Sequence, residues 1–260
     1  MPLPNVYEWK MDRIIRNVFH HDAKNIGDRA SGPTDYFFPK LGLKKNLKRL
    51  DLSEEKIVFG GGSLFSQVEG FIDDVRPNQT LVAWGLGIPE RGFNDEAVNR
   101  VASKFELFGT RNFDWSDQLD YVPCASCMLP VFDQIKAPTT DIVIFAHRRK
   151  VQDLYCPEEF PLLTNDCDNI EEAVDFISQG QTVVTSSYHG VYWAQLMGRK
   201  VVCVPYGSKF NTFKQQPIFA QADSWTNTMG TVQIHSPTLD ECRSLNRKFA
   251  AKVKQLWDLY

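Results

Sequence analysis

A single histidine, His189, lies in the stretch VVTSSYHGVYWAQLMGRKVVCVPYG, which runs from Val183 to Gly207. The stretch has the pattern of an apolar strand, a turn of small residues, a short helix and a second apolar strand. In open α/β sheets, ligands bind at the carboxyl ends of strands, where helix N-termini direct free N–H groups at anions. A histidine at such a turn can transfer protons, bind an anion or only cap the helix.

A second candidate, Asp28, lies in the stretch NIGDRASGP, from Asn25 to Pro33. Gly27 and Gly32 in this stretch permit a tight backbone. Asp28 can cap the next helix or stand in a cleft as an acid or base, and the spacing alone favours capping.

Two glycine-rich segments follow apolar runs of strand length. IVFGGGSLF contains Gly60, Gly61 and Gly62, and WGLG ends at Gly87. Such turns let backbone N–H groups approach an anion or a sugar closely, although ordinary tight turns have the same composition. Neither segment is a Walker motif or a G-x-G-x-x-G fingerprint.

An arginine and a pair of cysteines are further candidates for a functional site. Arg111, in FGTRN, ends a predicted strand and suits a carboxylate or a phosphate, although a surface position is the better explanation of a lone arginine. Cys124 and Cys127 form a C-x-x-C in a predicted exposed loop, and no second pair lies at zinc-ribbon spacing. We interpret them as buried structural thiols and expect no metal site.

The composition limits the class of protein. The chain has 260 residues, 43% of them hydrophobic and 23% charged, with a net charge of −3. These values are typical of a globular protein and give no electrostatic case for nucleic acid. The chain also has no apolar segment long enough for a membrane span and no secretory signal at its start, so we expect a cytoplasmic protein. The oligomeric state is left open, a homo-oligomer included.

Apolar runs of strand length alternate with amphipathic stretches, which predicts an α/β fold with parallel sheets. The predicted strands are Val6–Lys10, Lys56–Gly62, Thr80–Gly87, Lys104–Arg111, Thr140–His147, Gln181–Ser187 and Arg199–Tyr206.

Three helices are predicted with their ends. One runs from Asn94 to Ser103, and a second begins at the caps Asp168 and Asn169 and ends before Gly180. The third begins with a capping box formed by Thr238 and Glu241. Its predicted apolar stripe consists of Leu239, Cys242, Leu245, Phe249, Val253 and Leu256.

The polar segment Asp133–Asp141 is the predicted domain boundary. We therefore expect two Rossmann-like domains, residues 1–137 and 138–237, that face each other across a cleft. Residues 238–260 form a last helix that packs back across the boundary.

Several of these motifs together resemble the polysaccharide pyruvyl transferase family. They are NIGD, VFGGGSLF, WGLG, GTRN followed by VPCASC, and VVTSSYHGVYWAQLMGRKVVCVPYGSKF, spread between Asn25 and Phe210. The resemblance implies two Rossmann-like domains in a GT-B-like arrangement. It also implies transfer of the enolpyruvyl unit of phosphoenolpyruvate onto sugar hydroxyls, which forms a pyruvate ketal during surface polysaccharide synthesis, without a catalytic metal or another cofactor. Phosphoenolpyruvate and a sugar or glycan acceptor are the implied partners.

The resemblance places His189 and Asp28 in catalysis. His189 is the expected general acid or phosphate ligand, and Asp28 is the expected base on the sugar. The residues expected to bind substrate are Asn25, Gly27, Gly60, Gly61, Gly62, Arg111, Arg148, Ser186, Ser187, Tyr188 and Lys209.

One position departs from the family pattern. Many members have an arginine two residues before the histidine, where this chain has Ser187. The donor's carboxylate or phosphate then needs another cation. Arg111, Arg148, Arg149 and Lys209 are the candidates, with Arg148 favoured because it follows a strand end in the same half.

Two other functions remain open at this point. The first is a GT-B-type glycosyltransferase that uses a nucleotide sugar, for which Glu158, Glu159 or Asp166 would have to bind the ribose. The second is a glycan- or anion-binding protein without catalysis, which the serine at position 187 favours.

Overall fold

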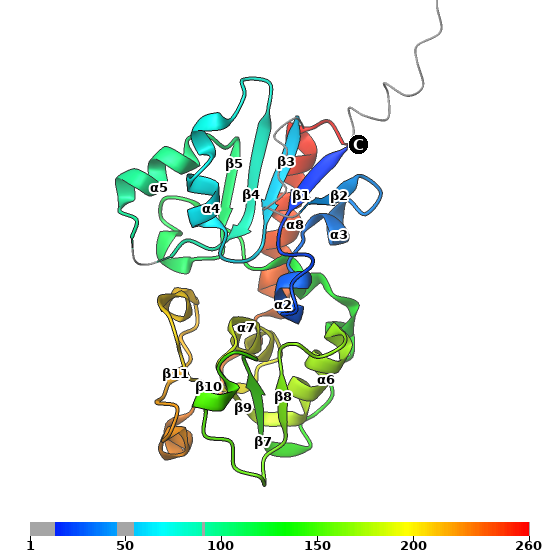
Figure 1. Ribbon diagram of the computed structural model, residues 1–260. Helices are drawn as coiled ribbons and strands as arrows, with labels where there is room; N and C mark the ends of the chain where they lie inside the picture. The colour runs from blue at the N-terminus through cyan, green and yellow to red at the C-terminus, as the bar shows by residue number, and fades with distance from the viewer. Residues whose placement is uncertain (1–13, 46–54, 90–91, 260) are drawn as a thin grey trace, which may run out of the picture.

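The computed structural model describes residues 14–45, 55–89 and 92–259, and these residues form two β-sheets with helices around them (Figure 1). The described strands of both sheets pair only in parallel, as the alternating pattern predicts. The protein is therefore α/β, with one sheet from each half of the sequence.

The first sheet has the strand order β2-β1-β3-β4-β5-β6. Its strands are β1 (Ile15–Val18), β2 (Gly42–Lys45), β3 (Lys56–Gly60), β4 (Thr80–Leu86), β5 (Leu107–Thr110) and β6 (Asp120–Tyr121).

The second sheet has the order β11-β10-β9-β7-β8. Its strands are β7 (Thr140–Ala146), β8 (Leu162–Thr164), β9 (Gly180–Thr185), β10 (Lys200–Cys203) and β11 (Ile218–Phe219).

The helices are α2 (Ile26–Arg29), α3 (Thr34–Phe37), α4 (Phe65–Glu69), α5 (Asp95–Ala102), α6 (Ile170–Gln179), α7 (Tyr188–Leu196) and α8 (Leu239–Leu256). Short 3₁₀ helices occur at Ile72–Asp74, Phe113–Trp115, Ala125–Met128, Pro130–Gln134, Val151–Asp153, Ser208–Thr212 and Trp225–Thr231.

The six predicted strands that fall on described residues are all present, most of them shorter than predicted. The predicted strand Val6–Lys10 lies outside the described residues. Strands β1, β2, β6, β8 and β11 were not predicted, because each has at most four residues and none is an apolar run of strand length. The cap of α6 is confirmed, since the Asn169 side chain accepts a hydrogen bond from the Glu172 N–H at 2.8 Å.

Helices cover both faces of the first sheet, which is why its central strands β3 and β4 are almost entirely buried. Helices α4 and α5 pack on one face of the first sheet and α8 on the other. Helices α6 and α7 pack on one face of the second sheet. Helix α2 lies between the two sheets, above α7 (Figure 1).

Helix α8 differs from its prediction at both ends. The Thr238 side chain makes no capping hydrogen bond, so the capping box is wrong, and Glu241 instead pairs with Lys214. Leu256 is 37% exposed, whereas Trp257 is buried in its place.

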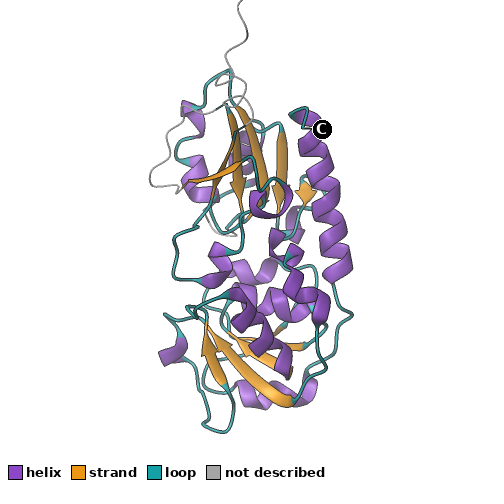
Figure 2. Cartoon of the chain, turned by 90° about the vertical axis from the view of Figure 1, so that its right-hand side faces the viewer, coloured by secondary structure: helices purple, strands orange, loops and turns teal. Residues whose placement is uncertain are grey.

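Contacts of α8 reach residues of both halves (Figure 2). Asn246 is fully buried and accepts a hydrogen bond from Trp84 Nε1 at 2.8 Å. Its amide also donates to the carbonyl of Pro123 at 3.0 Å. The helix therefore anchors the Cys124 loop with polar contacts as well as apolar ones.

Candidate functional site

A polar cavity of about 170 Å³ lies where strands of both sheets end. His20, Ser63 and Arg111 follow β1, β3 and β5 of the first sheet. His147 and the segment Ser187–His189 follow β7 and β9 of the second sheet. The complete lining is His20, Asn25, Asp28, Ser63, Arg111, His147, Ser187, Tyr188, His189 and Lys209. Because the carboxyl ends of parallel strands are where α/β proteins bind ligands, this is the candidate site.

A second cavity of about 400 Å³ adjoins the first and shares four residues with it, His20, Asn25, Asp28 and His147. Its other walls are Asp22, Ala23, Lys24, Arg148 and Arg149. Arg148, the favoured cation in the sequence analysis, therefore lines this second cavity, whereas Arg111 and Lys209 line the first.

His189 is the second residue of α7 and is only 2% exposed. Its ring packs directly on Gly27 of α2, since a Cβ at Gly27 would lie 2.1 Å from Nδ1. On the other side, Nε2 lies 3.5 Å from the Cys124 sulfur. Burial, and then the charges of Arg111 and Lys209, hold the pKa of His189 well below its usual value. The imidazole is therefore neutral at pH 7 and does not act as a general acid in the free protein.

Asp28 lies inside α2, not at its cap. The cap is Asn25, whose side chain accepts a hydrogen bond from the Gly27 N–H at 3.1 Å and donates one to Asp28 Oδ2 at 2.9 Å. Burial raises the pKa of Asp28, and the nearby His20, Lys209 and Arg111 counteract this rise. A carboxyl whose proton affinity depends on nearby cations is suited to exchanging protons.

Two cations face the same cavity. Arg111 is 4% exposed, donates a hydrogen bond to Ser63 Oγ at 3.0 Å and has its guanidinium carbon 3.8 Å from the centre of the Tyr188 ring. Tyr188 in turn stacks on Phe213. Burial, and then repulsion by Arg111, lowers the pKa of Lys209 to about 8. The two positive charges make the cavity a site for an anion.

His147 lines both cavities and is a site residue that the sequence analysis did not select. Burial, and then the charges of Lys209, Arg148, Arg149 and Lys150, lower its pKa to about 4. Its Nδ1 accepts a hydrogen bond from the Arg149 N–H at 3.2 Å, so the proton of the neutral ring is on Nε2. The signal that could have identified His147 is its place at the carboxyl end of a predicted strand, the same kind of place that identified His189. Ser63 was missed in the same way.

The glycines of the first half do not line either cavity, except that Gly27 supports His189 from behind. A Cβ at Gly60 would lie 2.3 Å from Pro33, and one at Gly61 would lie 2.2 Å from Ser31. These glycines thus permit close packing of the protein on itself. Ser186 is similarly occupied, since its hydroxyl accepts a hydrogen bond from the His147 N–H at 2.9 Å.

The Cys124–Cys127 segment is buried, so the predicted exposure of this loop is wrong. The interpretation of the two cysteines as buried thiols is confirmed. Glu158, Glu159 and Asp166, the residues considered for a ribose, are exposed and line neither cavity.

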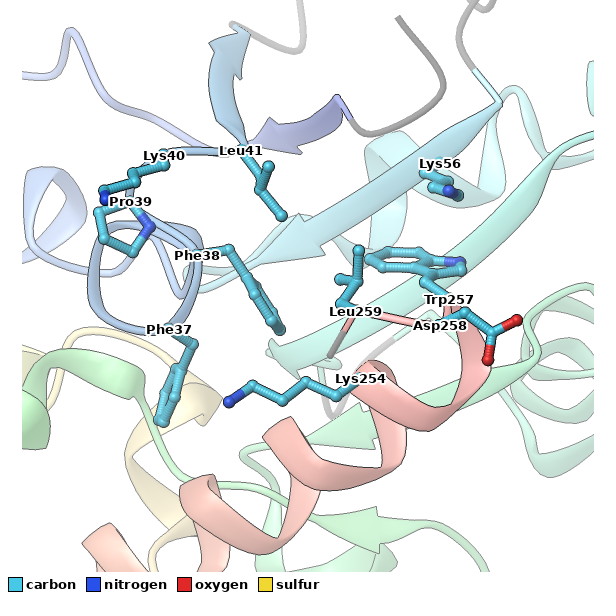
Figure 3. Close-up of a pocket in the computed structure, with 10 residues that line it drawn as sticks. All are labelled: Phe37, Phe38, Pro39, Lys40, Leu41, Lys56, Lys254, Trp257, Asp258 and Leu259. Atoms are coloured by element: carbon cyan, nitrogen blue, oxygen red, sulfur yellow. The ribbon is translucent and has the colours of Figure 1, made fainter. Parts of the chain in front are cut away.

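A further cavity, of about 660 Å³, lies at the other end of β3, where Lys56 begins the strand (Figure 3). It is lined by Phe37, Phe38, Pro39, Lys40, Leu41, Lys56, Lys254, Trp257, Asp258 and Leu259. Its walls are mainly apolar, with three aromatic side chains, and the residues that line it include one carboxylate, Asp258, and no histidine. We therefore place the chemistry in the polar cavity.

Two further observations concern metals and membranes. Among residues 14–45, 55–89 and 92–259, no group of three or more His, Cys, Asp or Glu side chains is arranged to hold a metal ion. Within the same ranges, no helix is both long enough and apolar enough to cross a membrane.

Comparison with known proteins gives structural similarity only. No protein-family model matches the sequence, and no curated protein matches it either. A solved structure of an uncharacterized protein from Klebsiella pneumoniae is similar, with 17% identity, a TM-score of 0.44, and coverage of 84% of this chain and 96% of that one. The wall teichoic acid polymerase TagF is similar with 10% identity, a TM-score of 0.46, and coverage of 95% and 83%. The spinosyn rhamnosyltransferase SpnG has 12% identity, a TM-score of 0.38, and coverage of 74% and 70%. Similarities of this size assign no function, so the site is interpreted from its own residues.

Proposed function

We propose that the protein is a glycan-modifying transferase that moves the enolpyruvyl unit of phosphoenolpyruvate onto sugar hydroxyls and forms a pyruvate ketal. The observation that carries this proposal is the polar cavity, in which Arg111 and Lys209 face Asp28 and His189. The motifs that resemble polysaccharide pyruvyl transferases contribute to the same cavity through Asn25, Arg111 and the Ser187–His189 turn.

The donor fits the charges of the cavity. Phosphoenolpyruvate has a phosphate and a carboxylate, and Arg111 and Lys209 supply one cation for each. Ser187 has the N-cap position of α7 and directs the free N–H groups of this nine-residue helix toward the same cavity. In this proposal, these groups replace the arginine that many family members have at position 187.

Formation of the first C–O bond requires one proton to be given and another to be taken. C3 of the enol accepts a proton, C2 becomes cationic, and a sugar hydroxyl attacks C2 and loses its own proton. Phosphate then leaves with the C2–O bond electrons, and a second hydroxyl attacks C2 and closes the ketal, its proton passing to the departing phosphate.

Asp28 is suited to both proton transfers. Arg111 and Lys209 lower the pKa of its carboxyl, and a bound anionic donor neutralises these charges. Donor binding therefore raises the pKa of Asp28 further and favours the protonated carboxyl next to C3. After Asp28 has given this proton, its carboxylate accepts the proton of the attacking hydroxyl. His189 is neutral and holds an oxygen of the donor by a hydrogen bond.

The test is a thermal-shift titration with phosphoenolpyruvate, beside UDP, GDP and CMP. A ligand that binds only the folded state stabilises it by about 2.7 kcal/mol at a hundred times its dissociation constant. We expect stabilisation by phosphoenolpyruvate alone, lost in Arg111→Gln and in His189→Ala. Arg247→Gln, at an exposed position of α8, is the matched control.

Turnover supplies the second arm of the test. With a glycan acceptor that the enzyme pyruvylates, Asp28→Asn should lower turnover about 10²–10⁴-fold, the usual contribution of a positioned proton carrier. Stabilisation by a nucleotide instead of phosphoenolpyruvate would make the protein a glycosyltransferase and would overturn the proposal.

A further inference from the structure

Beneath His189, three side chains that the proposed reaction does not use form a continuous row of hydrogen-bonding groups that ends at the His189 ring. Trp193 Nε1 lies 3.1 Å from Ser126 Oγ, and Ser126 Oγ lies 3.3 Å from the Cys124 sulfur. The Cys124 sulfur lies 3.5 Å from His189 Nε2. Trp193 and His189 come from α7, whereas Ser126 and Cys124 come from the segment that joins the two sheets.

The hydrogen bonds of this row all run in the same direction, from the Trp193 donor to the His189 acceptor. An indole N–H can only donate, so the Ser126 oxygen accepts from Trp193 and keeps its own hydrogen for the Cys124 sulfur. Burial raises the pKa of the Cys124 thiol, which therefore keeps its proton. An imidazole nitrogen accepts more strongly than a hydroxyl that already accepts a bond, so the thiol donates to His189 Nε2.

We propose that Cys124 and Ser126 are positioning residues that fix His189 as the tautomer with its proton on Nδ1. The nitrogen that carries the proton lies against Gly27, on the side of the ring where α2 meets α7. The inference rests on the proposed function in one respect, that the Nδ1–H donates to an oxygen of the anionic donor. Because Nε2 is occupied by the thiol, His189 holds the donor and does not remove a proton from the acceptor.

The surroundings of the row keep its geometry fixed. Cys124 is 1% exposed and Ser126 is fully buried, so water does not compete for their hydrogen bonds. The Cys124 carbonyl accepts a hydrogen bond from Tyr192 at 2.8 Å, and the preceding carbonyl, that of Pro123, accepts one from Asn246 of α8 at 3.0 Å. Hydrogen bonds from α7 and α8 to the backbone of this segment therefore hold the Cys124 sulfur next to the His189 ring.

Long-range ¹H–¹⁵N NMR spectra of protein labelled with ¹⁵N-histidine test the inference without any substrate. His189 is one of five histidines, and its signals are assigned by their loss in His189→Gln. We expect the Nδ1–H tautomer in the wild type and in Cys124→Ser, whose hydroxyl also donates. We expect the Nε2–H tautomer to become populated in Cys124→Ala.

Cys127→Ala is the matched control, because Cys127 is an equally buried thiol three residues away whose sulfur lies near Asn246 instead of His189. This variant should keep the Nδ1–H tautomer. An Nε2–H tautomer in the wild type, or a tautomer that is unchanged in Cys124→Ala, would overturn the inference.

Binding of phosphoenolpyruvate separates the two proposals. We expect Cys124→Ala to weaken it about tenfold, the loss typical of one hydrogen bond to a charged group, and Cys127→Ala to leave it unchanged. If the wild type has the Nδ1–H tautomer that Cys124→Ala loses but binds no phosphoenolpyruvate, the proposed function fails and the tautomer inference stands.

Discussion

The turn after β3 and the turn after β9 occupy equivalent places at the carboxyl ends of their strands, yet they are used differently. In the first, Gly60 and Gly61 bring the backbone close to Pro33 and Ser31, and only Ser63 lines the polar cavity. In the second, Ser187, Tyr188 and His189 all line it. Glycines at a strand end thus indicate close backbone packing, which here is against the protein itself, whereas polar side chains at a strand end mark the site.

Among the substitutions that test this difference between the two turns, Gly61→Ala should have the largest effect. Gly61 has a φ of +65°, and its Cβ would lie 2.2 Å from the Cβ of Ser31. The left-handed conformation and the overpacking together should lower the free energy of unfolding by about 3 kcal/mol. Urea unfolding measures this, with Gly230→Ala as the control, since a Cβ at Gly230 meets nothing within 4 Å. A loss below about 1 kcal/mol would mean that the turn adapts easily.

The substitution Gly27→Ala tests the contact between the two halves. Its Cβ would lie 2.1 Å from His189 Nδ1, so the ring must move, and we expect a destabilisation of about 1–3 kcal/mol with weaker phosphoenolpyruvate binding. In the His189→Ala background the same change should cost almost nothing, which a double-mutant cycle measures. Equal costs in both backgrounds would show that the clash is relieved elsewhere.

The smallest expected effect is a pH dependence of donor binding. Burial, and then Arg111, depresses the pKa of Lys209 to about 8, while Asp28 and Cys203 oppose the shift. The charged ammonium binds the anion, so affinity for phosphoenolpyruvate is full below this pKa and falls as the pH rises through about 8. Calorimetric titrations between pH 7 and 9 should show a loss of up to about tenfold. In Lys209→Arg the loss should disappear, because a guanidinium stays charged; an unchanged pH profile would assign the titration to another group.

The central strands could be predicted from the sequence because each is a buried apolar run, as in Val183–Thr185 of β9. Strand β1 could not, since its four residues include Arg16 and the fully buried Asn17, whose amide donates to Thr34. A buried asparagine in a strand is explained only by its tertiary partner. In the same way, the apolar stripe predicted for α8 contains Cys242, Phe249 and Val253, which are buried, but omits Asn246, which is buried through its bonds to Trp84 and Pro123.

Within the candidate site, local pattern raised His189, Asp28 and Arg111 as candidates, and the family resemblance selected them and added Lys209; all four line the same cavity. The sequence could not show that Cys124 lies against His189, because the two residues are 65 positions apart and meet only when the sheets assemble. It also could not give the proton affinity of Asp28, which arises from burial among cations drawn from both halves.

The contact between Gly27 and His189 also has an evolutionary consequence. The space over the imidazole ring admits no side chain at position 27, although the two positions are far apart in the chain. Under selection for donor binding, neither position can change first without loss. Homologues that share this architecture should therefore co-vary at this pair, keeping glycine wherever the histidine is kept and accepting larger residues only where the histidine has been replaced.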